Sequence, residues 1–170
     1  MKESEVIMYS KIRAKDIMAT RLVTLNPTDD VYQGLHALLT NKISGAPVVD
    51  IDGTFVGVFN EKSCMDVVIG DQYHGVSNNQ VQDLMFTDVK TIAPNTSIID
   101  IALMFRNEPL RRLPVLHNGK LVGLVSRRDV LRAVEDTMKK IGLPRKGKSV
   151  APIPYYSALI DPHDNSNSQA

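Results

Sequence analysis

The chain has 170 residues, of which 43% are hydrophobic, and this is enough for one compact domain with a substantial core. Its formal net charge is +1, so it has no overall electric field that would attract nucleic acid or an anionic membrane. No apolar run approaches the roughly 18 residues that a membrane-spanning helix needs, the first residues (MKESE) open no apolar signal segment, and a single cysteine excludes an internal disulfide. We therefore expect a soluble, cytoplasmic protein.

Residues 15–70 are predicted to form one unit of the order β-α-β-β-α, after a lead-in of residues 1–14. Its parts in chain order are an extended piece at residues 22–25, a helix opened by residues 27–30, strands at residues 46–49 and 55–59, and a helix at residues 61–69. Thr28 is suited to cap the first helix, whose predicted buried face consists of Val31, Leu35, Leu38 and Leu39. The Asp52-Gly53 pair between the strands is a strong hairpin signal.

A polar linker over residues 71–80 leads to a second unit, residues 81–138, with the same order of elements. Its parts are an extended piece at residues 89–92, a helix with Ile98, Ile101, Ala102 and Phe105 on one face, strands at residues 113–116 and 121–125, and a helix from residue 127 to about residue 138. The Asn118-Gly119 pair again marks the hairpin turn. Residues 139–170 form a basic, proline-containing tail that we expect to be partly disordered.

The two units are copies of one pattern. Asp16-Ile17-Met18 returns 67 residues later as Asp83-Leu84-Met85, and Ala46-Pro47-Val48 returns as Leu113-Pro114-Val115. Later landmarks keep their order, with the spacing shortened by one residue: Gly57-Val58 corresponds to Gly123-Leu124. An internal repeat of this kind determines the architecture, and we expect a ligand cleft where the two copies pack together.

This duplicated pattern resembles a tandem pair of cystathionine-β-synthase (CBS) domains, also called a Bateman module, over about residues 12–138. The resemblance implies an α/β fold in which two β-α-β-β-α repeats, related by a pseudo-twofold axis, pack through their small sheets. It further implies a homodimeric disc that binds adenosyl ligands in its clefts and regulates another protein, with no chemistry of its own.

The most specific local motif is Ser126-Arg127-Arg128-Asp129, which follows a predicted strand and opens a helix. The resemblance implies that Asp129 accepts hydrogen bonds from ribose hydroxyls and that Ser126 contacts ribose or phosphate. The same four residues match a capping box, in which the serine only stabilises the start of the helix. The two roles are compatible, because a capping serine can still face a ligand.

A cation is expected next to this motif. Arg112, with Arg111 as second choice, stands just before the third predicted strand, where the resemblance places a basic residue against a phosphate; the planar guanidinium suits two phosphate oxygens. The alternative is that these arginines only solvate a surface. The first copy has Ser63 in place of the acid and Ser44-Gly45 in place of the arginines. Three alternatives stay open for its own cleft: it is empty, it binds weakly, or it takes another ligand.

By resemblance, residues of the first copy wall the cleft of the second. The candidates for this wall are Thr20, Ile43 and Ala46, together with Leu124 from the second copy. Flat apolar walls suit a purine. The alternative for Ile43, Ala46 and Leu124 is a place in the core.

We expect a regulatory module that binds AMP, ADP or ATP ahead of S-adenosylmethionine, because Arg112 suits a phosphate. No cofactor, metal site or catalytic residue is predicted, since the histidines have no metal-ligand spacing and no nucleophile motif occurs. A homodimer and an unidentified regulated protein are the expected partners. One alternative is a ligand-free dimeric scaffold. The other, nucleic-acid binding through the arginines and the basic tail, is disfavoured by the near-zero charge and the lack of aromatic residues among the basic ones.

Overall fold

The computed structural model describes residue 9 and residues 11–65 and 80–140. Nearly all of the expected linker and tail, and most of the lead-in, therefore lie outside the described residues. The named elements are α2 (Ala14–Ile17), α3 (Val31–Asn41), β1 (Gly45–Val49), β2 (Phe55–Asn60), α5 (Val81–Leu84), α6 (Ile98–Asn107), β3 (Arg112–His117), β4 (Lys120–Ser126) and α7 (Arg127–Lys140). Residues 61–65 are also helical.

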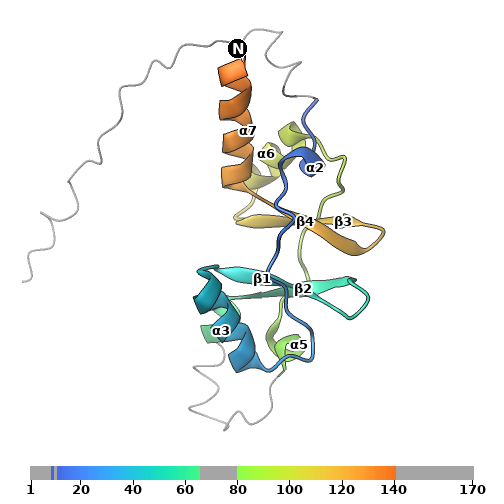
Figure 1. Cartoon of the computed structure of the whole chain (residues 1–170), viewed down its shortest axis with the longest axis vertical. Helices are drawn as coiled ribbons and strands as arrows, with labels where there is room; N and C mark the ends of the chain where they lie inside the picture. The colour runs from blue at the N-terminus through green and yellow to red at the C-terminus, as the bar shows by residue number, and fades with distance from the viewer. Residues whose placement is uncertain (1–8, 10, 66–79, 141–170) are drawn as a thin grey trace, which may run out of the picture.

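Two antiparallel hairpins, β1 with β2 and β3 with β4, form the centre of the molecule. Figure 1 shows them facing each other, with α2, α6 and α7 beyond one hairpin and α3 and α5 beyond the other. The expected extended pieces each add only one parallel bridge, Leu25 to Val48 in the first copy and Ile92 to Val115 in the second. The predicted α/β fold of two repeats with small sheets is confirmed.

The short helices α2 and α5 exchange places between the two copies. The backbone N–H of Ala14 in α2 donates to Thr96 O at 2.9 Å, and Ala14 is fully buried in the core around α6, β3 and β4. In the same way, the N–H of Val81 in α5 donates to Asp29 O at 2.8 Å, and Val81 is buried in the core around α3, β1 and β2. The segment after each helix must therefore pass between the two hairpins, which brings it to the clefts.

The predicted helix faces are partly wrong. In α3 the buried residues are Val31, Gly34 and Leu38, whereas Leu39 is 71% exposed. Gly34 lies inward because the Phe59 ring packs against it: a Cβ added there would lie 3.0 Å from the ring. In α6 the expected Ala102 is also exposed, while the other three predicted residues are buried.

The expected cap of the first helix is also wrong. The Thr28 hydroxyl donates to Asn26 Oδ1 at 2.8 Å, and the N–H of Asn26 donates to Asp29 Oδ2 at 2.8 Å. These bonds fold residues 26–29 into a turn of their own. The helix consequently starts later, and Asp30 caps it by accepting the N–H of Tyr32 at 2.8 Å.

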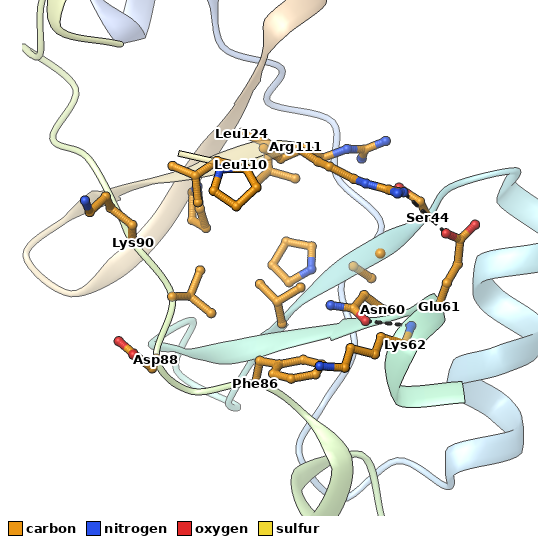
Figure 2. Close-up of a pocket in the computed structure, with 18 residues that line it drawn as sticks. Ser44, Asn60, Glu61, Lys62, Phe86, Asp88, Lys90, Leu110, Arg111 and Leu124 are labelled. Carbon is orange, nitrogen blue, oxygen red and sulfur yellow. Dashed lines mark hydrogen bonds and ion pairs between the residues drawn. The ribbon is translucent and has the colours of Figure 1, made fainter. Parts of the chain in front are cut away.

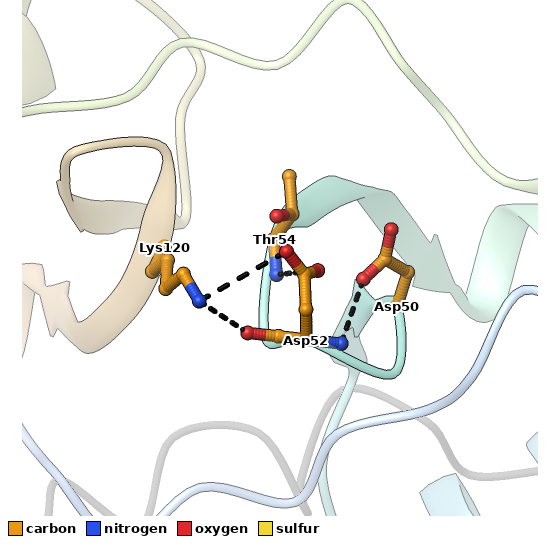
Figure 3. A network of polar contacts seen from close by, with 4 residues as sticks. All are labelled: Asp50, Asp52, Thr54 and Lys120. Atoms are coloured by element: carbon orange, nitrogen blue, oxygen red, sulfur yellow. Dashed lines mark hydrogen bonds and ion pairs between the residues drawn. The ribbon is translucent and has the colours of Figure 1, made fainter.

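The two hairpin turns meet at one end of the seam between the copies. The N–H of Phe55 donates to Gly119 O at 3.0 Å, and Lys120 Nζ donates to Asp52 O at 2.8 Å and lies 3.9 Å from Asp52 Oδ2 (Figure 3). Hydrogen bonds with Asp50 and Thr54 lower the pKa of the Asp52 carboxyl from 3.8 to about 2. Each turn contains a glycine with positive φ, as expected from its sequence.

Two further backbone pairs join the copies. Val58 and Phe86 exchange N–H···O bonds of 2.9 and 2.8 Å, and Ala19 and Leu124 exchange bonds of 2.9 and 3.0 Å. Backbone hydrogen bonds thus join the two copies at several points of the seam, and cavities open beside it. Among the described residues, no helix has the length and apolar character needed to cross a membrane.

Candidate functional site

Two cavities of different size lie beside the seam between the hairpins. The smaller has a volume of about 250 Å³, and the larger has a volume of about 450 Å³. The smaller is lined by the segment after α2, the start of β1 and the facing ends of β3, β4 and α7; its residues are Ala19, Arg21, Leu22, Val23, Ile43, Gly45, Pro47, Arg112, Leu124, Ser126 and Asp129. Both copies contribute to each cavity.

The acid of the smaller cavity stands in the first turn of α7. Ser126 ends β4, and its hydroxyl donates to Asp129 Oδ2 at 2.6 Å while its N–H donates to the same oxygen at 2.8 Å. The N–H of Asp129 approaches the serine hydroxyl at 3.4 Å, which completes a capping box. The other carboxylate oxygen, Asp129 Oδ1, makes a longer contact: Nη1 of Arg132 lies 3.8 Å from it. The capping interpretation therefore holds, and the same two residues still line the cavity.

Two cations share this cavity with Asp129. Arg112, the first residue of β3, pairs with Ser126 across the hairpin, so strand register places it beside the acid. Among the described residues no carboxylate forms an ion pair with Arg112. Arg21 also lines the cavity, although it was not among the predicted site residues. Its place in the segment just after Asp16-Ile17-Met18 was the available signal.

The structure brings five of the eight predicted residues to the smaller cavity: Asp129, Ser126, Arg112, Ile43 and Leu124. It places the other three elsewhere. Thr20 is exposed and lines neither cavity, and Ala46 is fully buried in the first core and borders the larger cavity. Arg111 lines the larger cavity and pairs with Glu61 at 3.5 Å. Arg112 borders both cavities, whereas Arg111 lines only the larger one.

The equivalent positions of the first copy carry no acid and no cation. Gly45 pairs with Asn60 as Arg112 pairs with Ser126, so the two positions correspond in register. Ser63, which stands where the acid would be, is fully buried, and its hydroxyl accepts the N–H of Asn60 at 3.3 Å. The first copy keeps the capping arrangement of the motif without its carboxylate.

The larger cavity is the cleft of the first copy, which was expected from the repeat, but its lining residues were not predicted. Figure 2 shows Leu110 and Arg111 on one side, Phe86 and Lys62 on the other, with Lys90 toward one end. Lys62 Nζ lies 5.3 Å from the centre of the Phe86 ring. Four cations and two acids line this cavity: Lys62, Lys90, Arg111, Arg112, Glu61 and Asp88. The sequence signal was the stretch 86–90, the counterpart of residues 19–23 in the repeat.

Comparisons with known proteins bear on both copies. The family model of the CBS domain matches residues 14–70 and again residues 81–136. The uncharacterized protein MJ1225 of Methanocaldococcus jannaschii is 25% identical over 118 residues, which are 69% of this chain and 41% of that protein. The A-adding tRNA nucleotidyltransferase of Aquifex aeolicus is 26% identical over 133 residues, which are 78% of this chain and 16% of the enzyme. The chain thus spans less than half the length of either relative.

A solved structure shares the arrangement of the two copies. CBSX2 from Arabidopsis thaliana, in complex with AMP, is 29% identical with a TM-score of 0.65, and the match covers 73% of this chain and 96% of CBSX2. Since the family model matches both repeats and the fold agrees with that of a CBS-pair protein, the chain belongs to the family of CBS-domain proteins.

Proposed function

We propose that this chain is a regulatory CBS-pair module that senses an adenine nucleotide bound in the smaller cavity. The observation that carries the proposal is the meeting of Asp129, Ser126 and Arg112 at one cavity whose remaining wall, apart from Leu124, comes from the other copy. A carboxylate in the first turn of α7 and a guanidinium at the start of β3 suit the sugar and the phosphate of a single nucleotide.

Each part of the nucleotide has a counterpart in the cavity. Asp129 Oδ1 accepts hydrogen bonds from the ribose hydroxyls, while Arg112 and Arg21 neutralise the phosphate. The adenine packs between the apolar residues at the start of the cleft, which are Leu22, Val23, Ile43 and Leu124. S-adenosylmethionine has no phosphate for the two arginines, so it is expected to bind more weakly than AMP, ADP or ATP.

The size of the cavity favours the monophosphate. A volume of about 250 Å³ lies just below the usual range for small-molecule pockets, about 300–1,000 Å³. Further phosphates would extend toward solvent and contribute less. The AMP complex of CBSX2, a relative that the match covers almost entirely, supports the same ligand class.

Sensing follows from the position of the cavity between the copies. Residues 19–23 and Ile43 come from one copy, and Arg112 and Asp129 from the other, so a bound nucleotide ties the two together. A ligand shifts a conformational equilibrium only by its different affinities for the two states. We infer that the chain acts on an unidentified partner protein through this coupling, as a homodimer and without catalytic activity of its own.

Calorimetry with AMP tests the site. Asp129→Asn keeps an oxygen for the capping box but loses the charge, and we expect AMP affinity to fall by about tenfold or more, since hydrogen bonds to charged groups contribute about 1.5–3 kcal/mol. Asp100→Asn is the matched control: Asp100 sits in the first turn of α6 in the same geometry, 2.6 Å from the Ser97 hydroxyl, and lines neither cavity. Tight AMP binding by Asp129→Asn would reject the proposed site.

A further inference from the structure

Met18 takes up the space of a missing side chain on the facing strand. Gly123 of β4 is buried, and a Cβ built on it would lie 2.4 Å from Met18 Sδ and 2.7 Å from Met18 Cγ. The thioether of the segment after α2 therefore lies directly on the backbone of β4. A close-packed contact of this kind has no room for a further atom between its two sides.

The residues that follow Met18 form a wall of the smaller cavity. Ala19 exchanges two backbone hydrogen bonds with Leu124, of 2.9 and 3.0 Å. Ala19, Leu124 and residues 21–23 all line the cavity. The next backbone anchor that the structure shows for this segment is Leu25. A displacement at the sulfur of Met18 is thus transmitted to the cavity wall over a single residue.

The thioether is also a group that an oxidant can alter. A peroxide transfers one oxygen atom to the sulfur: its O–O bond breaks, an S–O bond forms, the sulfur is oxidised, and the second oxygen leaves with both protons as water. The product is a sulfoxide, which is polar where the thioether is apolar. Met18 is half-buried, so its side chain is within reach of a small oxidant.

A sulfoxide oxygen at Met18 disturbs the seam wherever it points. The neighbouring N–H groups of Met18, Ala19 and Leu124 already donate to the backbone oxygens of Ala14, Leu124 and Ala19. The added oxygen stays unpaired, takes a donor from the Ala19–Leu124 pair, or reaches water by drawing the side chain off β4. Each course costs the seam a contact or a hydrogen bond.

Three other methionines provide a comparison. Met65 and Met138 are 55% and 43% exposed, so an oxygen added to either of them reaches water directly. Met85 is the counterpart of Met18 in the repeat, and a Cβ on the glycine that faces it would lie 3.0 Å from its Sδ. Met85 is followed by a wall of the larger cavity. Met18 has the tighter contact and adjoins the smaller one.

We propose that Met18 is a site of oxidative modification: conversion of its thioether to the sulfoxide by a peroxide loosens residues 19–23 from β4 and weakens nucleotide binding in the smaller cavity. The effect on the nucleotide rests on the proposed function, whereas the modification and the accompanying loss of stability stand without it. Methionine sulfoxide reductases reverse the reaction, so the chain responds reversibly to an oxidant as well as to its ligand.

Hydrogen peroxide, added to the full chain, is the probe. Peptide mass spectrometry follows the gain of one oxygen at each methionine, and calorimetry measures the affinity for AMP before and after treatment. We expect oxidation of Met18 to weaken AMP binding by about fivefold or more, since an unpaired polar oxygen is unfavourable in a packed contact. Met18→Leu keeps nearly the same volume without the sulfur, so it should bind AMP normally and keep that affinity after peroxide. Retained affinity cannot come from misfolding.

Met65→Leu and Met85→Leu are the controls. Peroxide should weaken AMP binding in both of them as it does in the unaltered chain. Protection by Met85→Leu equal to that by Met18→Leu would overturn the assignment to Met18. The proposal would also be overturned if Met18 stayed unoxidised after full conversion of Met65, or if a chain oxidised at Met18 bound AMP with unchanged affinity.

Urea unfolding separates this proposal from the proposed function. Peroxide should lower the urea midpoint of the unaltered chain more than that of Met18→Leu, because only the unaltered chain gains an oxygen in the seam. An equal decrease in the two proteins would reject the site. If neither protein binds AMP while the midpoints differ in this way, the proposed function fails and the modification site remains.

Discussion

Ser126 stabilises the start of α7 and also lines the smaller cavity, and the two roles can be separated experimentally. Ser126→Ala removes the acceptor of a capping box, so we expect the free energy of unfolding to fall by about 1 kcal/mol without ligand. Ser97→Ala should cost a similar amount, because Ser97 accepts the N–H of Asp100 at 3.1 Å in the same arrangement on α6.

The two serine variants should differ in ligand binding. Urea unfolding measures the stability of each, and calorimetry measures its affinity for AMP. We expect weaker AMP binding in Ser126→Ala and unchanged binding in Ser97→Ala, since only Ser126 lines a cavity beside the seam. Equal affinities in the two variants would mean that Ser126 is only a helix cap.

The Asp52 carboxylate gives the hairpin seam a pH dependence. Its pKa is lowered from 3.8 to about 2, first by a side-chain hydrogen bond with Asp50 and then by hydrogen bonds with Thr54. Figure 3 shows the N–H of Thr54 donating to Asp52 Oδ1 at 3.2 Å. A lowered pKa in the folded state contributes stability that is present above pH 3.8 and is lost as the pH falls toward 2. Asp52→Asn lacks this contribution at every pH.

Urea unfolding of the two proteins between pH 5 and pH 2 tests this point. We expect the unaltered chain to be the more stable at pH 5 and the difference to shrink progressively as the pH falls from about 4 to 2. A difference that stays constant over this range would show that the Asp52 charge has no part in holding the turn.

At the scale of elements, the two copies approach each other closely at two glycines, Gly57 in β2 and Gly123 in β4. A Cβ at Gly57 would lie 2.7 Å from the backbone oxygen of Phe86, whereas a Cβ at Gly123 would lie 2.4 Å from Met18 Sδ. Both substitutions by alanine overpack the seam, and we expect each to lower the free energy of unfolding by about 1–3 kcal/mol.

The two glycines should respond differently to a second substitution. Shortening Met18 to alanine removes the atoms that crowd residue 123, so Gly123→Ala and Met18→Ala should cost less together than the sum of their separate effects. Met85→Ala should not rescue Gly57→Ala in this way, because the Phe86 carbonyl remains in place and accepts the N–H of Val58. Equal coupling energies in the two cycles would contradict this difference.

The strands were predictable because their local signals agree. Each hairpin has a turn with glycine at positive φ between two short apolar runs, and the observed strands exceed the predicted ones by no more than one residue at either end. The helix cap at Thr28 and the buried position of Leu39 were wrong for tertiary reasons. A turn of side-chain bonds at residues 26–29 delays the helix, and the Phe59 ring selects which side of α3 is buried.

The charged part of the candidate site was predictable because the acid and the cation occur in the second copy and are absent from the first. Arg112 and Ser126 lie on paired strands of one hairpin, so the sequence motif predicts that they are neighbours. The larger cavity brings together residues 86–90, 109–112 and 60–62, whose proximity depends on the exchange of α2 and α5. Sequence spacing contains no measure of that exchange. Arg21 was missed for a different reason: its segment was expected at the cleft, but Thr20 was chosen from it as the lining residue.

For the whole molecule, the helices of the second copy leave apolar side chains uncovered on their outer side. Ile99 and Leu103 on α6 are 38% and 42% exposed, and Leu131 and Met138 on α7 are 68% and 43% exposed. A groove of about 360 Å³ lies between these helices and is lined almost entirely by apolar residues, including Leu103. Apolar surface concentrated in this way is typical of a protein interface.

We expect this surface to be the contact of the proposed homodimer. Leu103→Glu places a charge in the groove, and burying an unpaired charge costs far more than an apolar contact contributes. Sedimentation equilibrium over a range of concentrations should therefore show a dimer for the unaltered chain and a monomer for Leu103→Glu. Ile51→Glu is the matched control and should leave the dimer intact. Ile51 is 99% exposed in the turn between β1 and β2, and Figure 1 shows this hairpin on the side of the molecule away from α6 and α7. A dimer that survives Leu103→Glu must use another face, and a monomeric unaltered chain would limit nucleotide sensing to the two copies of a single subunit.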